Sequence, residues 1–152
     1  MGNERLAIEK IKERIGEGAI AEIKQFRNEV TIVVHKEAIL EVAKLLREDP
    51  VLDYDFLSDV CGVDWLGKTY RFEVVYHLYS LQHNSRLRLK VRLEEKEPSL
   101  PSVVEVWPTA NWHEREVFDM FGIVFTGHPD LRRILNPDDF DGFPYRKDFP
   151  IR

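Results

Sequence analysis

The chain ends in a stretch that cannot form a core of its own. From Gly127 onward the sequence contains four prolines and no run of apolar residues at the spacing of a helix or a strand. A segment needs a repeating apolar face to form a core, and this one has none. Its aliphatic and aromatic residues nevertheless make it too apolar for a typical disordered tail. We therefore expect a folded body over residues 1–126 and an extended arm over residues 127–152, packed partly on this body and partly on a partner.

A short helix is predicted immediately before the arm. Asn111 is suited to cap its first turn, and Glu114 stands three residues later, which is the spacing of a capping box. Gly122 favours the left-handed conformation that ends many helices. The apolar residues between them fall on one side of this helix, and the charged residues crowd the remainder.

The body combines helices and strands. Residues 4–18 and 36–47 have the three- and four-residue apolar spacing of amphipathic helices. Strands are predicted over residues 19–26, 30–34, 56–65, 70–80 and 87–93. Residues 87–93 alternate strictly, so one face should be buried and the other basic and solvated. Ser102 and Glu105 have capping-box spacing and predict a short helical turn. The fold class is therefore α+β, with helices packed on one face of a mainly antiparallel sheet and an extended irregular C-terminal arm.

Composition and charge exclude several classes of function. The net charge of −5 gives no general attraction to nucleic acid or to anionic lipid. No apolar run approaches the ~20 residues that span a bilayer, and we expect no signal peptide. The single cysteine, Cys61, excludes an internal disulfide and cannot hold an iron–sulfur cluster, which takes about four thiolates. Because its neighbours are apolar, we expect it to be a small buried hydrophobic residue.

The predicted helix and the arm contain residues that could form the metal or acid–base site of a free-standing enzyme. The candidates are His113, Glu114, Glu116, Asp119 and His128. His113 and Glu114 begin like the zinc-protease motif, but Val117 occupies the position of its second histidine. We favour the alternative, in which a charged helix face meets arginines from this chain or from another.

Individual histidines and tryptophans also have structural explanations. His128 could serve in a proton relay, but we favour an imidazole that bonds a backbone carbonyl, with Asp130 capping the turn. His77 lies in an apolar strand and is expected to be a satisfied core or sheet residue. The three tryptophans, Trp65, Trp107 and Trp112, are expected to be core or interface anchors.

The arm also carries clusters of charge. Its cations include Arg132, Arg133, Arg146 and Lys147, and Asp148 follows directly. No glycine-rich loop accompanies them, and the aspartates of the arm match its cations in number. Because arginine forms bidentate pairs with carboxylates, these residues favour a polar interface over an anion pocket.

Several motifs of this chain also carry a family resemblance. They are Phe-Leu-Ser-Asp-Val-Cys-Gly-Val-Asp-Trp (56–65), Arg-Phe-Glu-Val-Val-Tyr-His-Leu (71–78), Ala-Asn-Trp (110–112), Glu-Arg-Glu-Val-Phe-Asp-Met-Phe-Gly-Ile (114–123), Gly-His-Pro-Asp-Leu-Arg-Arg-Ile-Leu (127–135) and Gly-Phe-Pro-Tyr-Arg-Lys-Asp-Phe-Pro (142–150). In this order they resemble the C subunit of respiratory complex I, which is the small peripheral-arm subunit of proton-pumping NADH:quinone oxidoreductases. The resemblance covers roughly residues 51–150.

The resemblance implies a structural and assembly subunit without an active site of its own. The family holds no cofactor; FMN and iron–sulfur clusters belong to partner subunits. It packs against the hydrogenase-like D subunit near the quinone end of the peripheral arm, with cluster-bearing subunits nearby. The assembly, an NADH:quinone oxidoreductase that works as a translocase, would place the chain on the cytoplasmic face of the cell membrane. The alternative is the equivalent subunit of a related membrane-bound hydrogenase, or of a dehydrogenase fed by ferredoxin or a deazaflavin.

The expected partner-binding residues follow from the motifs of the helix and the arm. They are Glu114, Arg115, Glu116, Asp119, His128, Asp130, Arg132, Arg133, Arg146, Lys147 and Asp148.

Overall fold

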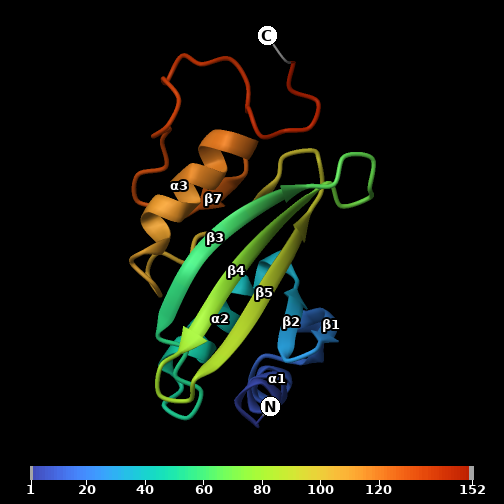
Figure 1. The fold of residues 1–152 in the computed structure, drawn as a ribbon, viewed down its shortest axis with the longest axis vertical. Helices are drawn as coiled ribbons and strands as arrows, with labels where there is room; N and C mark the ends of the chain where they lie inside the picture. Colours follow the sequence, from blue (N-terminus) through green and yellow to red (C-terminus); the bar gives the residue numbers. More distant parts are fainter. Residues whose placement is uncertain (1, 151–152) are drawn as a thin grey trace.

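The computed structural model describes residues 2–150 (Figure 1). Its elements are α1 (Gly2–Arg14), η1 (Glu17–Ala19), β1 (Ile20–Phe26), β2 (Glu29–Val34), η2 (Lys36–Ala38), α2 (Ile39–Glu48), β3 (Phe56–Asp64), β4 (Phe72–Ser80), β5 (Ser85–Leu93), β6 (Ser99–Pro101), α3 (Ala110–Phe121) and β7 (Val124–Thr126). The predicted helices and strands of the body are present, with boundaries shifted by a few residues. The two short strands β6 and β7 were not predicted.

The main sheet has five strands in the order β1-β2-β5-β4-β3. The pairings β1–β2, β3–β4 and β4–β5 are antiparallel, whereas β2 and β5 run parallel. The prediction of an α+β fold with a mainly antiparallel sheet is confirmed. A parallel pairing needs a crossover, which the chain between β2 and β5 provides by passing through α2, β3 and β4.

Helices α1 and α2 cover one face of this sheet, and the opposite face is open (Figure 1). The core lies between them and contains Ile11 of α1, Leu46 of α2, Tyr76 of β4 and Leu89 of β5, all fully buried. The strict alternation of residues 87–93 produces the expected two-faced strand, since its leucines and valine are buried.

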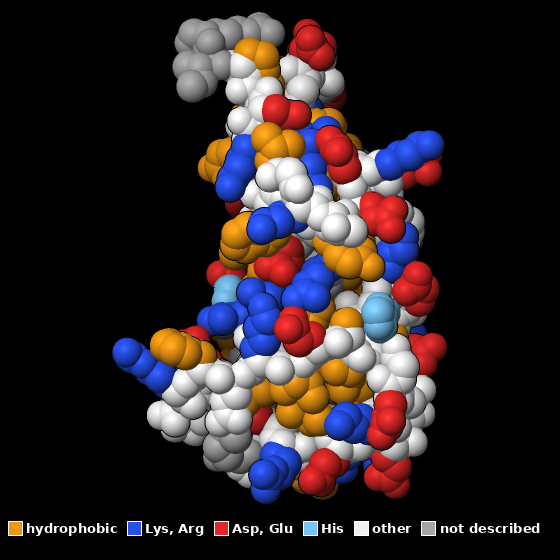
Figure 2. Space-filling view, turned by 90° about the vertical axis from the view of Figure 1, so that its right-hand side faces the viewer, with side chains coloured by type: hydrophobic (Ala, Val, Ile, Leu, Met, Phe, Trp, Pro, Cys, Tyr) orange, Lys and Arg blue, Asp and Glu red, His pale blue; other side chains and the backbone are white. Residues whose placement is uncertain are grey.

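The basic residues of β5 face the open side, and three of them, Arg88, Lys90 and Arg92, pair with acidic residues of other strands. Arg92 bonds Glu22 of β1 at 2.5 Å, and Arg88 bonds Glu29 of β2 at 3.2 Å. From the side that lies at the right of Figure 1, Lys and Arg side chains alternate with Asp and Glu side chains (Figure 2). The visible surface therefore presents no field of a single sign.

Helix α3 packs against β3, and its end follows the prediction whereas its start does not. A Cβ atom on Gly62 would lie 2.6 Å from the Phe121 ring, so the helix rests directly on the strand. Gly122 ends the helix with a φ of 78°. The predicted cap is wrong, because Asn111 lies inside the helix and Thr109 precedes its first residue. Glu114 does not turn back to the helix start, since buried donors outside the helix bind its carboxylate.

The predicted turn at Ser102 forms, but not as a capping box. The Ser102 hydroxyl accepts the Val104 N–H at 3.1 Å, as a cap would. Glu105 instead lies 3.2 Å from Lys44 of α2, and the segment makes a single turn rather than a helix.

Residues 127–150 form turns and bends, without helix or strand, and lie over the end of α3 and the adjacent end of the sheet (Figure 1). No helix within the described residues 2–150 is long and apolar enough to cross a membrane.

Candidate docking site formed by α3 and the C-terminal arm

Asp119 of α3 anchors the first half of the arm. Its carboxylate is fully buried and accepts the N–H groups of Ile134, Leu135 and Asn136 at 3.2, 2.7 and 2.9 Å. The Asn136 side chain donates to the other oxygen at 2.9 Å, and Arg133 Nε lies 3.2 Å from it. Burial would raise the pKa of Asp119, but the hydrogen bonds outweigh it and lower that pKa. A buried negative charge is thus matched by donors from the arm.

Arg71 and Asp64 anchor the end of the arm. Both side chains are buried, and Arg71 Nε and Nη2 each donate to Asp64 at 2.9 Å. Arg71 also reaches Asp148 at 2.8 Å and Glu95 at 2.7 Å, and the Lys147 N–H donates to Asp64 at 2.8 Å. Burial opposes the charge on Asp64, but Arg71 outweighs burial and lowers the pKa of this carboxyl. The pair therefore stays charged while it holds the arm.

Arginines stacked on aromatic rings complete the attachment. The Arg146 guanidinium lies 5.0 Å from the Phe72 ring centre and 4.8 Å from that of Phe143. Its Nε donates to the Phe121 carbonyl at 2.7 Å, which joins the arm to the end of α3. Arg133 lies 4.9 Å from the Phe143 ring centre. Such cation–π contacts strengthen when they are shielded from water, and burial lowers the pKa of Arg146.

A second set of residues faces outward from α3 and the start of the arm. Trp112 is 51% exposed, and the Arg115 guanidinium lies 5.9 Å from its ring centre. Arg115 Nε donates to the Arg132 carbonyl at 3.3 Å, and Arg132 pairs with Asp130 at 3.1 Å. We call Trp112, Arg115, Asp130 and Arg132 the α3–arm surface. It combines an exposed indole with arginines held in place by neighbouring groups.

Glu114 faces inward, away from this surface. It is fully buried, and its carboxylate accepts the Ser102 hydroxyl at 2.5 Å and the Val103 N–H at 2.9 Å. Burial raises the pKa of Glu114 to about 7, against the opposing effect of these two hydrogen bonds. The buried hydroxyl of Tyr76 has no hydrogen-bond partner among the described residues, and burial followed by the charge of Glu114 raises its pKa.

The imidazole of His128 has the predicted structural role. His128 Nε2 lies 3.2 Å from the Asn111 carbonyl oxygen, and Nδ1 accepts the Asp130 N–H at 3.0 Å. The prediction that this imidazole bonds a backbone carbonyl is confirmed. The contact between His128 and Asn111 fastens the start of the arm to α3.

The alternative metal site of the sequence is not assembled. Its members have separate partners, since Glu114 binds Ser102, Asp119 binds Asn136 and His128 binds Asn111. Within residues 2–150, three side chains of metal-binding type come together elsewhere, at Asp59, Cys61 and His77.

One prediction for the sheet needs correction, and another is confirmed. Cys61 is exposed rather than buried, because it lies on the open face of β3. Partial desolvation and then the charge of Asp59 raise the pKa of its thiol. The prediction that His77 is a satisfied core or sheet residue is confirmed in its second form, since His77 lies in β4 with Asp59 as its partner and its side chain is 39% exposed.

The tryptophans divide between core and surface. Trp107 is buried and donates its indole N–H to the Tyr54 carbonyl at 3.0 Å. Trp65, which is 44% exposed, lies beneath the Lys147 ammonium at 5.9 Å.

Sequence reasoning missed the Asp64–Arg71 anchor. The two residues frame the loop between β3 and β4, where the Trp65 N–H also donates to the Arg71 carbonyl at 2.6 Å. An oppositely charged pair at the two ends of a short loop was the available signal.

Comparison with known proteins identifies the family. The family described as "Respiratory-chain NADH dehydrogenase, 30 Kd subunit" matches residues 32–152. The chain is 57% identical over 127 residues to the NADH-quinone oxidoreductase C subunit of Roseiflexus castenholzii, covering 84% of this chain and 73% of that protein. It is 47% identical over 152 residues to the protein of the same name from Geotalea uraniireducens, covering 100% of this chain and 91% of the relative.

Two solved structures are similar. The trypsin-resistant fragment (1–134) of Nqo5 superposes with a TM-score of 0.68 and 34% identity, covering 82% of this chain and 99% of the fragment. A chain of the membrane-bound sulfane sulfur reductase, an archaeal respiratory membrane complex, gives a TM-score of 0.79 and 25% identity, covering 99% of this chain and 87% of that one. The chain therefore belongs to the family of the respiratory-chain NADH dehydrogenase 30 Kd subunit, as a relative of the bacterial NADH-quinone oxidoreductase C subunits.

Proposed function

We propose that this chain is a non-catalytic structural subunit of a proton-pumping NADH:quinone oxidoreductase, and that it docks on the hydrogenase-like D subunit near the quinone end. FMN and iron–sulfur clusters belong to partner subunits in this proposal, and the chain lies peripherally on the cytoplasmic face of the cell membrane as part of the membrane complex. The observation that carries it is an irregular arm fixed to its own body through Asp119 and Arg71, while the α3–arm surface faces outward.

The predicted partner-binding residues divide between two roles. Glu114, Asp119, His128, Arg133 and Arg146 are buried or half-buried and bind groups of this chain, and the exposed Asp148 pairs with the buried Arg71, so these six residues hold the surface in shape. Arg115, Glu116, Asp130, Arg132 and Lys147 are partly or fully exposed and make the direct contacts. Tryptophan and arginine are the residue types that most often dominate the binding energy of an interface.

The rigidity of the arm favours tight docking. A segment that is ordered before binding loses less conformational entropy when its partner arrives. The buried carboxylates accept several arm N–H groups, so the conformation that meets the partner is already present in the free chain.

The test is affinity purification from gently solubilised native membranes. Helix α1 lies at the end of the molecule opposite the arm (Figure 1), so a tag before Gly2 leaves the α3–arm surface free. Co-elution of the D subunit with flavin- and cluster-bearing NADH-input subunits is the expected result. Recovery of the chain alone would contradict the proposal.

A related membrane-bound assembly is the second candidate. The similarity over 99% of this chain to a chain of the sulfane sulfur reductase complex favours it. The same purification distinguishes the two, because a partner like the D subunit without an NADH-input module would indicate the second assembly.

A further inference from the structure

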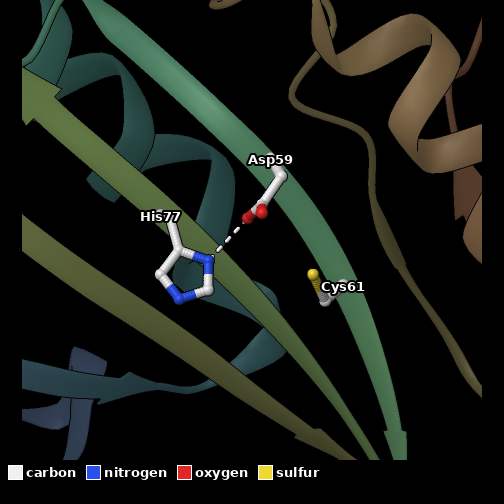
Figure 3. A group of neighbouring side chains, drawn as sticks. All are labelled: Asp59, Cys61 and His77. Atoms are coloured by element: carbon white, nitrogen blue, oxygen red, sulfur yellow. Dashed lines mark hydrogen bonds and ion pairs between the residues drawn. The ribbon is translucent and has the colours of Figure 1, made fainter.

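Three side chains with different donor atoms meet on the open face of the sheet, outside the α3–arm surface. Asp59 and Cys61 come from β3, and His77 comes from β4 (Figure 3). Residues two apart on a strand point to the same face, so Asp59 and Cys61 lie next to each other. Asp59 is also the direct cross-strand neighbour of His77.

A bulge in β3 creates this arrangement. The pairing shifts between Leu57 and Asp59, which leaves Ser58 as an extra residue opposite β4. The shift places Asp59 opposite His77 on the open face, while Leu57 and Val60 on either side remain in the core. Bulges commonly re-aim side chains in this way beside functional sites.

We propose that Asp59, Cys61 and His77 form a binding site for zinc or a similar divalent cation of borderline softness. One ligand atom from each residue lies within 4.8 Å of the other two, and the three supply oxygen, sulfur and nitrogen. Thiolate and imidazole select metals such as zinc over magnesium or calcium, which prefer oxygen ligands alone.

Tetrahedral coordination requires different distances between the ligand atoms from those observed. Zinc bonds of about 2.0–2.3 Å place neighbouring ligand atoms about 3.3–3.8 Å apart. The oxygen of Asp59 and Nδ1 of His77 are now 2.5 Å apart and must separate. The Cys61 sulfur lies within 4.8 Å of a ligand atom of each of these two residues, and the paired strands hold the backbone in place.

The interaction between Asp59 and His77, which metal binding would replace, contributes little to the stability of the fold. Asp59 and His77 form an ion pair or hydrogen bond whose side chains are 43% and 39% exposed. Pairs this accessible add little to stability because water screens them. The competing structural role of these residues therefore does not oppose metal binding strongly.

The fourth coordination position has room for an exchangeable ligand. Asp59 and His77 also line a hollow of about 480 Å³ on the same face. A zinc ion with three protein ligands normally keeps water in its fourth position. The site accordingly resembles an open zinc site more than a closed structural one.

The test is a titration of the full-length, chelator-treated chain with Co²⁺, followed by displacement with Zn²⁺. Cobalt bound to a thiolate gives a charge-transfer band, and in this chain only Cys61 can supply that thiolate. We expect one cobalt per chain, d–d bands of tetrahedral intensity, and loss of the spectrum when zinc is added.

Variants separate a three-ligand site from a lone cysteine. His77→Gln and Asp59→Asn should weaken cobalt binding at least tenfold, and Cys61→Ser should abolish the charge-transfer band. His83→Gln, in the exposed turn between β4 and β5, is the matched control and should bind as the wild type does. Thermal unfolding of each variant without metal establishes that it is folded.

Any of three results would overturn the proposal. The first is the absence of a charge-transfer band from the wild type at micromolar cobalt. The second is a band of unchanged affinity in His77→Gln, which indicates that His77 is not a ligand. The third is one cobalt per two chains, which indicates a site shared between two copies.

Discussion

Two buried carboxylates of the same helix have pKa values displaced in opposite directions. Asp119 and Glu114 are both fully buried in α3. Asp119 accepts several N–H groups from residues 134–136, which outweigh burial and lower its pKa. Glu114 has only the Ser102 hydroxyl and the Val103 N–H, and burial raises its pKa to about 7. The balance between burial and hydrogen-bond donors therefore decides which carboxylate stays charged.

Glu114→Gln should remove a pH dependence of stability. The pKa of Glu114 rises from 4.5 to about 7 on folding, so the folded state binds more protons between these values. The free energy of unfolding of the wild type should therefore fall as pH rises from 4.5 to 7, by about 3 kcal/mol from this group. Urea denaturation at several pH values measures the difference between variant and wild type, which should grow over that interval.

The control for this titration is Glu116→Gln. Glu116 is half-buried on the same helix, so its replacement reports the loss of one negative charge outside the Ser102 site. Parallel curves for Glu114→Gln and the wild type from pH 4.5 to 7 would show that burial does not displace the Glu114 titration.

Gly62→Ala should destabilise the contact between β3 and α3. A Cβ atom there would lie 2.6 Å from Cδ2 of Phe121, and a close-packed core cannot yield that space freely. Overpacking of this kind costs about 1–3 kcal/mol, which a lower urea midpoint would reveal. Gly18→Ala is the control, because its Cβ atom would meet nothing within 4 Å. Equal midpoints for the two variants would contradict the observed packing.

At the scale of elements, the arm is attached mainly through two acidic residues of the body. Asp119 receives N–H groups from residues 134–136, and Asp64 receives that of Lys147. The arm has no helix or strand that would hold it in place by itself. Removal of the Asp119 or the Asp64 carboxylate should therefore release the part of the arm that this carboxylate binds.

Asp119→Asn should expose the arm to protease. The change removes the negative charge to which the N–H groups of the arm donate. We expect it to lower the local stability of the arm by about 3 kcal/mol. Trypsin cleavage after Arg132 and Arg133 should then be faster by about a hundredfold. This holds when the arm opens and closes faster than trypsin cuts, because the cleavage rate is then proportional to the fraction of molecules with an open arm. Limited proteolysis with time points measures this rate.

Asp130→Asn is the matched control for the protease experiment. The exposed side chain of Asp130 pairs with Arg132 at the surface, so its loss should change the cleavage rate little. Similar rates for Asp119→Asn and Asp130→Asn would mean that the Asp119 anchor does not hold the arm.

The elements of the body were predictable because their patterns are local. The alternation of residues 87–93 and the apolar spacing of α2 each follow from which face is buried. Pairing between distant residues was not predictable by the same reasoning. The parallel contact of β2 with β5 and the short β6–β7 ladder depend on tertiary packing.

The candidate site was predictable in its residues more than in its geometry. The charges of α3 and the arm were visible, but their orientation depends on donors far away in the sequence. Glu114 fails as a helix cap because Ser102 and Val103 bind it instead. Cys61 is exposed because the bulge at Ser58 fixes the face to which it points, and no local pattern shows the bulge.

On the scale of the whole molecule, the possible contact surfaces are spatially separated. The α3–arm surface lies at one end of the molecule and α1 at the other, with the open face of the sheet between them (Figure 1). Substitutions in one region can therefore be tested without touching another.

Arg132→Glu should weaken docking without unfolding the chain. Arg132 is 66% exposed and belongs to the α3–arm surface, so reversing its charge opposes a complementary partner. A residue central to an interface contributes about 2 kcal/mol or more, which corresponds to roughly thirtyfold weaker binding. The yield of the D subunit recovered with the tagged variant, relative to the wild type, measures the effect.

The control is Lys12→Glu, which makes the same charge change on an exposed residue of α1, at the opposite end of the molecule. If docking uses the α3–arm surface, only Arg132→Glu loses its partners while both variants unfold at the wild-type temperature. An equal loss in both would point to net charge as the determinant, because a general electrostatic effect does not depend on which surface carries the substitution. Full recovery with Arg132→Glu would place the interface elsewhere, and the open face of the sheet would then be the next surface to test.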